Sequence, residues 1–278
     1  MNIKIFTKES IAGAIYLCKR CFGAHSGYKN NCRVLLYHSV GESDCRNDTM
    51  GLSVSEDVFY MQMKYLRDNK FFLMSLPELV DRIKNNVLFP DKSIAITFDD
   101  GYRSILTKAF PILKSFGFSA TAFINVYFTE KRVAGDFYWE RWDTLSWDEV
   151  AELHKDGLLI GSHALSHRRL GELSIKELEH EISISRDRIE SRIKERIDAF
   201  SYPHGSFNKT VKDVLRRNKF TSSCASIQGC VSLKSDIFAL RRTEITSFDN
   251  TSSKFQKKLL GCYDWLRCRG FNAQGQRN

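Results

Sequence analysis

The sequence contains no low-complexity segment and no recognisable membrane span. The apolar stretch near its beginning, residues 11–18, is shorter than the roughly 20 residues that a membrane-spanning helix needs. This stretch also lacks the charged leader region and the small-residue cleavage site of a signal peptide. We therefore expect a packed globular protein in the cytoplasm, where residues 1–32 form an amphipathic helical segment that packs on the domain or lies on the inner membrane surface.

The sequence also lacks the features of a nucleic-acid-binding protein. Its net charge is +9, from 42 basic and 33 acidic residues, but the basic residues are scattered instead of forming a stripe interleaved with aromatic residues. No known nucleic-acid-binding module is recognisable either. Scattered basic residues usually form a solvated surface, and they also favour an anionic membrane surface or an acidic polymer. We expect no nucleic acid partner.

The eight cysteines do not form a metal or disulfide framework. Cys18 and Cys21 have the CxxC spacing, but no second CxxC completes a four-thiolate site. The spacings in a chain of this length are not those of a small secreted disulfide scaffold. We expect reduced thiols with mainly structural roles.

The length and the element pattern favour an α/β protein. A chain of 278 residues suffices for one barrel-sized α/β domain or for two small domains. Strand-like and helix-like segments alternate, which predicts parallel strands joined by helical crossovers. The strands are expected at 33–38, 94–98, 120–124, 158–160, 199–202, 222–226 and 238–240. The helices are expected at 56–69, from 76, and at 104–116, 146–155, 174–193, 208–218 and 253–268, with a long connection at 126–145.

Two short motifs point to metal-assisted hydrolysis. Asp99 and Asp100 end one apolar run, and His163 and His167 follow another with a spacing of four residues. One carboxylate and two imidazoles make a three-ligand site for a divalent metal with an open position for water. The other carboxylate can then act as a base beside that water. Taken alone, the Asp-Asp-Gly sequence is equally typical of a turn.

Further reactive side chains also follow predicted strands. His38 follows the first strand, the loop Pro203-His204-Gly205 follows another, and Arg242 lies near the last. The active sites of barrel enzymes lie at the carboxyl ends of the strands. We therefore expect these residues to share one face with the Asp pair and the two histidines.

These motifs resemble those of the polysaccharide deacetylases of the NodB-homology type, carbohydrate esterase family 4. The resemblance rests on Thr97-Phe98-Asp99-Asp100-Gly101-Tyr102, on the His163/His167 pair after Gly161-Ser162, and on the loop Phe200 to Gly205. It covers residues 33–248. It implies a distorted (β/α) barrel of about seven parallel strands over residues 33–250, with a packed C-terminal helix in residues 251–278.

The resemblance also implies roles for individual residues. Asp100, His163 and His167 would hold the metal, and Asp99 would be the base that removes acetyl from an N-acetyl sugar. The loop Tyr202-Pro203-His204-Gly205 would line the groove, with the backbone N–H of His204 donating to the oxyanion. Zinc is the default cation for two imidazoles and one carboxylate, while cobalt, nickel, iron or manganese fit the same ligand set.

The chain departs from the common family pattern at three positions. No histidine follows His204, so the acid is assigned to His38, which resembles the early histidine of the permuted branch containing bacterial poly-N-acetylglucosamine deacetylases. Ser201 stands where many members have arginine, and Arg242 is the candidate charge that steadies Asp99. Ala164 replaces the usual hydroxyl residue between the two histidines, which removes one hydrogen bond around the metal ligands.

The expected substrate is an N-acetylated glycan of a surface polysaccharide or its lipid-linked precursor. Two alternatives stay open: hydrolysis of an O-acetyl ester or another linear amide at the same site, and glycan binding by a catalytically weak site. Trp139 and Trp142 either stack on sugar rings or fill the core.

Overall fold

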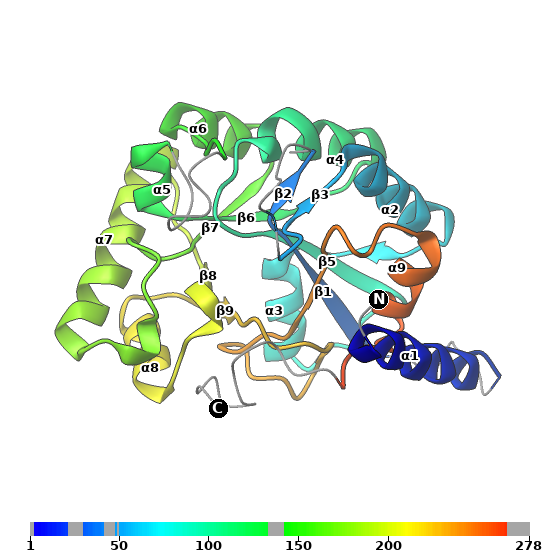
Figure 1. Cartoon of the computed structure of the whole chain (residues 1–278). Coiled ribbons are helices and arrows are strands. Elements are labelled where there is room, and N and C mark those ends of the chain that lie inside the picture. The colour runs from blue at the N-terminus through cyan, green and yellow to red at the C-terminus, as the bar shows by residue number, and fades with distance from the viewer. Residues whose placement is uncertain (1–2, 22–29, 42–47, 49, 133–141, 266–278) are drawn as a thin grey trace.

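A computed structural model describes residues 3–21, 30–41, 48, 50–132 and 142–265. Its central feature is a curled sheet of parallel strands (Figure 1). From one edge to the other, the parallel strands follow the order β11, β1, β5, β6, β7, β8 and β9. Their bounds are Arg242–Glu244, Asn31–Tyr37, Ser93–Phe98, Thr121–Ile124, Leu159–Ser162, Ala199–Ser201 and Ser222–Cys224. The predicted barrel of about seven parallel strands is confirmed.

Four shorter strands accompany this sheet. β10, Val231–Ser232, pairs antiparallel with the start of β1, and β4, Phe72–Leu73, pairs parallel with β5. β2, Ser39–Val40, and β3, Ser53–Val54, form a separate parallel pair directly after β1.

The segment 240–244 joins the last strand of the barrel to the first. Leu240 makes an isolated parallel bridge with Cys224 at the end of β9. Two residues later the chain enters β11, where Arg242 lies opposite Val34 of β1. One short segment therefore contacts both edges of the sheet, which curls the strands into a distorted barrel.

Helices surround the strands on the outside (Figure 1). The outer helices in chain order are α2, Glu56–Asp68; α4, Phe110–Phe116; α6, Trp147–Lys155; α7, Ile175–Ile193; and α8, Lys209–Arg217. Ser146 and Ser174 form the predicted capping boxes at the starts of α6 and α7. Gly117 ends α4 with a φ of 67°, the left-handed conformation that glycine adopts without strain.

The alternation of side chains along the strands separates two apolar clusters. Leu35, Ile96 and Phe200 belong to the larger cluster, which packs against the outer helices. Their chain neighbours Val34 and Ala95 belong to a second cluster, which also contains buried residues of α3, Leu76–Lys84. Because successive side chains of a strand point to opposite faces, this second cluster marks the barrel interior.

Four predicted elements differ from those observed. The connection 126–145 begins with a short helix, α5, Val126–Lys131, which Asn125 caps. The helix expected from 104 begins with a π-helical turn, η2, Ile105–Ala109, before α4. The strand expected at 238–240 is only the bridge at Leu240. The last helix, α9, is Ser252–Leu259 and ends early because Gly261 turns the chain with a φ of 69°.

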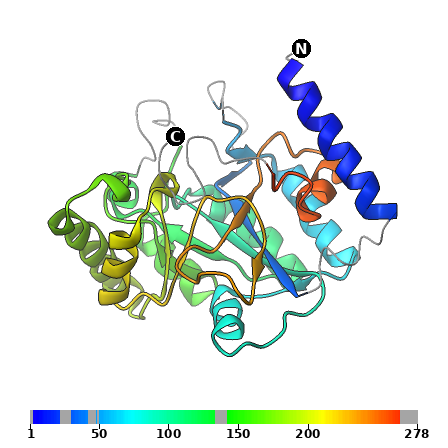
Figure 2. The same cartoon turned by 90° about the horizontal axis from the view of Figure 1, so that it is seen from below.

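The N-terminal helix α1, Ile3–Cys21, lies beside α9 (Figure 2). Tyr16 donates a hydrogen bond of 2.9 Å to Gln256, and Tyr263 donates to Glu9 at 3.0 Å. Within the described part of the chain, no helix is both long and apolar enough to span a membrane. The expected division at residues 32 and 250 stays a prediction.

Candidate active site

Strand alternation explains why several polar side chains meet inside the barrel. Ala95 of β5 faces the interior, so Thr97 and Asp99, two and four residues later, face it too. By the same rule, Leu240 and Arg242 share the interior face, as do Ala199 and Ser201. The interior is therefore apolar near the amino ends of the strands and becomes polar toward their carboxyl ends.

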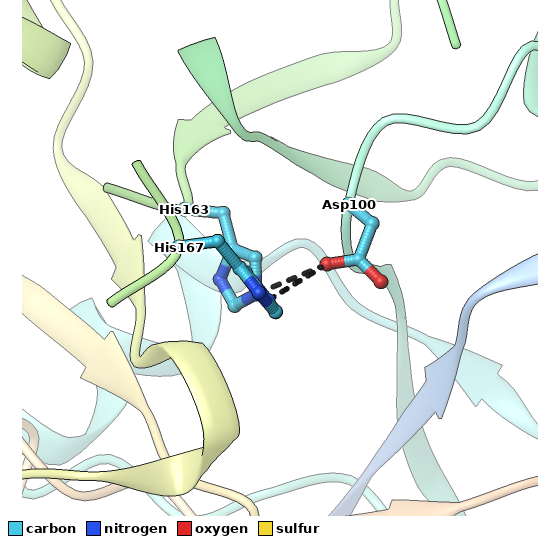
Figure 3. Close-up of side chains that lie close together, drawn as sticks. All are labelled: Asp100, His163 and His167. Carbon is cyan, nitrogen blue, oxygen red and sulfur yellow. Dashed lines mark ion pairs between the residues drawn. The ribbon is translucent and has the colours of Figure 1, made fainter. Parts of the chain in front are cut away.

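Asp100, His163 and His167 bring three potential metal ligand atoms together (Figure 3). The Nε2 atoms of both histidines lie 3.3 Å from Oδ1 of Asp100. All three ligand atoms lie within 4.8 Å of one another. Asp100 and His163 are buried and His167 is partly exposed, so the cluster opens toward solvent on the His167 side.

The chemistry of this group fits a divalent cation. Oδ1 of Asp100 is buried and has no hydrogen-bond partner among the described residues, although it faces two imidazoles. Nδ1 of His163 lies 2.8 Å from the carbonyl oxygen of Ser201. A proton on Nδ1 that is donated to this carbonyl leaves the lone pair of Nε2 for a metal. The predicted ligand set is thus brought together by the fold, and two imidazoles with one carboxylate suit zinc and similar ions.

The backbone around these ligands adopts unusual conformations. Asp100, Ala164, His167 and His204 have φ values of 72°, 61°, 60° and 55°. Residues other than glycine seldom adopt a positive φ, and such positions concentrate at functional sites where the surroundings hold them. Here they turn the chain sharply after the strands, so that neighbouring side chains point into one space.

Asp99 lies in a buried network with Arg242 and Ser201. The guanidinium of Arg242 donates to both carboxylate oxygens of Asp99, at 2.8 Å and 2.7 Å. The hydroxyl of Ser201 donates to Asp99 at 3.0 Å and accepts from Arg242 at 2.9 Å. The charge that the sequence predicted to steady Asp99 is thus Arg242, which β11 delivers.

The electrostatics of this pair favour the ionised carboxylate. Burial by itself would raise the pKa of Asp99, but the adjacent Arg242 and His163 lower the pKa below its usual value. Burial would likewise raise the pKa of Asp100, and the two imidazoles lower the pKa well below its usual range. Both carboxylates are therefore charged at neutral pH.

His38 follows β1 at the same end of the barrel. Its partly exposed ring carries a buried Nδ1 atom that has no hydrogen-bond partner among the described residues. The positive charge of a protonated His38 is among the influences that lower the pKa of Asp99. Ser104 at the start of η2 fixes this segment, because its hydroxyl accepts from the N–H of Val40 at 3.1 Å and lies 3.0 Å from the hydroxyl of Ser39.

The loop from Tyr202 to Gly205 follows β8 beside the histidines. The ring of His204 lies 4.5 Å from that of His167, and its Nε2 lies 3.1 Å from the carbonyl oxygen of His167. Partial burial and the neighbouring His167 lower the pKa of His204 to about 4, so its side chain is neutral. Tyr202 and Pro203 are buried. The N–H groups of Gly205 and Ser206 close the turn on the carbonyl oxygens of Tyr202 and Pro203.

Two polar residues that the sequence motifs did not indicate hold the histidine loop. Asn125 donates to the carbonyl oxygen of His163 at 2.8 Å, and Glu181 accepts from the N–H groups of Leu165 and Ser166 at 3.1 Å and 3.0 Å. Glu181 was detectable in principle, because a glutamate directly before Ile182 interrupts the apolar face of a predicted helix. Asn125 stands directly after a predicted strand, as a capping residue does.

The tryptophans were expected either to stack on sugar rings or to fill the core. Trp142 is buried and packs edge-on against Tyr102 at 5.1 Å, which makes it a core residue. Trp139 lies outside the described residues.

The cysteines whose side chains the structure describes are all unpaired, namely Cys18, Cys32, Cys224, Cys230 and Cys262.

Fold and site together define a parallel α/β barrel with a candidate metal centre at the carboxyl ends of its strands. Residues 87–223 match the family model described as polysaccharide deacetylase. The chain thus contains a polysaccharide deacetylase domain, and the resemblance that the motifs indicated is confirmed.

Curated relatives agree with this assignment, and a solved structure agrees with the fold. YxkH of Bacillus subtilis, whose name places it among the polysaccharide deacetylases, is 24% identical over 213 residues, 77% of this chain and 71% of the relative. The poly-beta-1,6-N-acetyl-D-glucosamine N-deacetylase of Staphylococcus epidermidis is 26% identical over 215 residues, covering 68% and 70% of the two chains. The deacetylase PplD of Streptococcus pyogenes, solved in complex with acetate, superposes with a TM-score of 0.72 at 23% identity, covering 82% and 98%. This last likeness supports the fold.

Proposed function

We propose that this protein is a metal-dependent N-deacetylase that removes acetyl groups from a polysaccharide of N-acetylglucosamine or from its precursor. The observation that carries the proposal is the convergence of Asp100, His163 and His167 on one space beside the ionised Asp99. Relatives named as poly-N-acetylglucosamine deacetylases support the substrate class. Zinc is the proposed cation, since two imidazoles and a carboxylate are its usual ligands.

Asp99 is the proposed base. A divalent cation, when bound, supplies Lewis acidity that acidifies a water and polarises the acyl oxygen. Arg242 and Ser201 keep Asp99 ionised and oriented, so its carboxylate can accept the proton of the attacking water. The same contacts weaken its basicity, which makes an acidified water necessary. Asp99 itself stands outside the cluster of metal-ligand candidates, so the lone pairs that Arg242 and Ser201 leave free can accept this proton.

His38 is the proposed acid. Departure of a sugar amine requires a proton on its nitrogen, and an imidazole holds a transferable proton near neutral pH. The ring of His38 is partly exposed at this end of the barrel, so it can approach a substrate group. The backbone N–H of His204 is the proposed donor to the oxyanion, because the turn uses the N–H groups of Gly205 and Ser206 instead.

The direct test is acetate release by the purified protein. We expect the zinc-loaded protein to release acetate from β-1,6-linked N-acetylglucosamine oligomers, and the chelator-treated protein to release none until the metal is restored. An O-acetylated ester substrate, assayed in parallel, separates the amide from the ester reaction. No acetate release from any N-acetylated sugar polymer or lipid-linked sugar would overturn the proposal, and tight oligomer binding without release would favour the glycan-binding alternative.

A second, separate proposal concerns α1. We propose that the exposed face of α1, with Ile11, Leu17 and Cys18, contacts the anionic inner surface of the membrane. The net charge of +9 of the chain provides the complementary charge. We expect sedimentation with vesicles that contain anionic lipid and none with neutral vesicles. Equal behaviour with both vesicle types would contradict this contact.

A further inference from the structure

We propose that Glu181 is a positioning residue that holds the His163–His167 loop in its metal-binding shape. The inference rests on the proposed metal site. Glu181 lies on α7, outside the motifs that define the site, and its side chain is buried with a relative exposure of 3%. It therefore has a cost of burial that some contact must offset.

Within the described part of the chain, the hydrogen bonds of the Glu181 side chain all go to the histidine loop. Its Oε2 accepts from the backbone N–H groups of Leu165 and Ser166, at 3.1 Å and 3.0 Å. Its Oε1 accepts from the hydroxyl of Ser166. No basic side chain of the described residues forms an ion pair with it. Two loop amides and one loop hydroxyl thus replace the salt bridge that a buried carboxylate usually has.

The opposite side of the loop is held by the start of α5. The side-chain amide of Asn125 donates to the carbonyl oxygen of His163 at 2.8 Å. The backbone N–H groups of Val126 and Tyr127 donate to the carbonyl oxygens of Ala164 and Leu165, at 3.3 Å and 2.8 Å. The carbonyl oxygens of the loop therefore face α5, while its N–H groups face the carboxylate of α7.

This double attachment explains how the loop keeps its strained backbone. Ala164 and His167 both have positive φ values, 61° and 60°, which alanine and histidine seldom adopt. Between them lie Leu165 and Ser166, the two residues that Glu181 binds. A carboxylate suits this position because it accepts from several donors at once, whereas a glutamine brings an NH2 group toward N–H groups that need acceptors.

Position 164, between the two histidines, carries a buried alanine and so offers no side-chain hydroxyl to the loop. In this chain the N–H of Ala164 donates to Ser162 at 3.2 Å, and the hydroxyl two residues further, on Ser166, reaches Glu181. Hydrogen bonds to Ser162 and Glu181 thus hold the loop without a side-chain hydroxyl at position 164.

The test is the metal affinity of Glu181→Gln, measured by competition with a chromophoric chelator. We expect an affinity for zinc about 10- to 100-fold weaker than that of the unmodified protein, as is typical when a residue that orients ligands is lost. Glu179→Gln is the matched control, because it removes a carboxylate from the same helix that pairs with Arg217 at the surface. We expect the control to bind zinc like the unmodified protein.

Two further measurements separate positioning from general stability. Hydrogen exchange of the Leu165 and Ser166 amides in the metal-free protein should accelerate in Glu181→Gln and stay slow in the control. Ser166→Ala, a milder change, should weaken zinc binding a few-fold, and it serves as the test variant if Glu181→Gln does not fold. Unchanged zinc affinity in Glu181→Gln would overturn the positioning role, even if the thermal stability of the variant fell. If Glu181→Gln does not fold, unchanged zinc affinity in Ser166→Ala would overturn it. A failure of the unmodified protein to bind zinc would instead overturn the metal site itself, and the positioning role with it.

Discussion

The two ends of the barrel differ in their side chains and in their backbone. Toward the amino ends, the interior holds Val34, Ala95 and other apolar residues packed with α3. Toward the carboxyl ends, the interior holds Asp99 and Arg242 in a buried ion pair, next to a cluster of metal-ligand candidates. The apolar end derives its stability from packing, and the polar end depends on each charge having its partner.

Two arginine–carboxylate pairs make this difference measurable. Arg242 and Asp99 have side-chain exposures of 0% and 4%, whereas Arg33 and Asp264, near the start of β1, have exposures of 8% and 31%. Both arginines donate to both oxygens of their carboxylate. The geometry is alike, so the difference between the two pairs lies mainly in the access of water.

The largest expected effect separates the two neighbouring aspartates. We expect Asp99→Asn to lower turnover by about 100- to 10,000-fold, the range for loss of a general base, while zinc still binds. We expect Asp100→Asn to lose both turnover and tight zinc binding. Steady-state acetate release and metal titration measure the two properties. Substantial turnover in Asp99→Asn would show that the base is a different residue.

The two ion pairs should differ in what their loss costs. We expect Arg242→Met to lower the free energy of unfolding by about 3–5 kcal/mol, because it leaves the buried charge of Asp99 without a partner. Arg33→Met is the matched variant, and we expect a cost of about 1 kcal/mol, since water screens the half-buried Asp264. Urea denaturation near neutral pH measures the free energy of unfolding of both variants. Equal losses would show that burial does not set the cost of breaking these ion pairs.

The smallest of these effects concerns packing in the barrel interior. A Cβ atom at Gly161 of β7 would lie 2.6 Å from the ring of Phe123 and 2.8 Å from the carbonyl oxygen of Ala199. We expect Gly161→Ala to cost about 1–3 kcal/mol, the range for overpacking. Gly13→Ala in α1 is the control, because nothing outside its own helix backbone and chain neighbours lies within 4 Å of the added Cβ, and alanine favours a helix over glycine by about 1 kcal/mol. No loss of stability in Gly161→Ala would mean that the interior can expand.

The regular elements were largely predictable from the sequence. The helices that begin at Ser146 and Ser174 carry capping boxes, and β5 is a continuous apolar run, so local patterns were sufficient. By contrast, β11 has the sequence Arg242-Thr243-Glu244, which carries no apolar pattern. Its arginine is tolerated inside the barrel only because Asp99, 143 residues earlier, lies opposite.

The metal-ligand candidates were predictable for a related reason. Asp100, His163 and His167 carry their chemistry in the residue type and lie just after strands, and parallel strands bring their carboxyl ends together. Residue type and spacing mark Glu181 as a charged residue on the apolar face of α7, but they do not tell that it holds the histidine loop, or that Asn125 holds the other side of that loop. These contacts join different elements, over separations of 16 and 38 residues.

The sequence by itself determined the alternation of strands and helices, the end of the barrel where reactive side chains gather, and the ligand types offered to a cation. Only the tertiary structure decided how Arg242 reaches Asp99, from a strand without an apolar pattern, and which carboxylate supports the loop between the histidines. The reason is physical: hydrophobic periodicity and capping act over a few residues, whereas the burial of a charge is settled by whichever partner the folded chain brings within hydrogen-bonding distance.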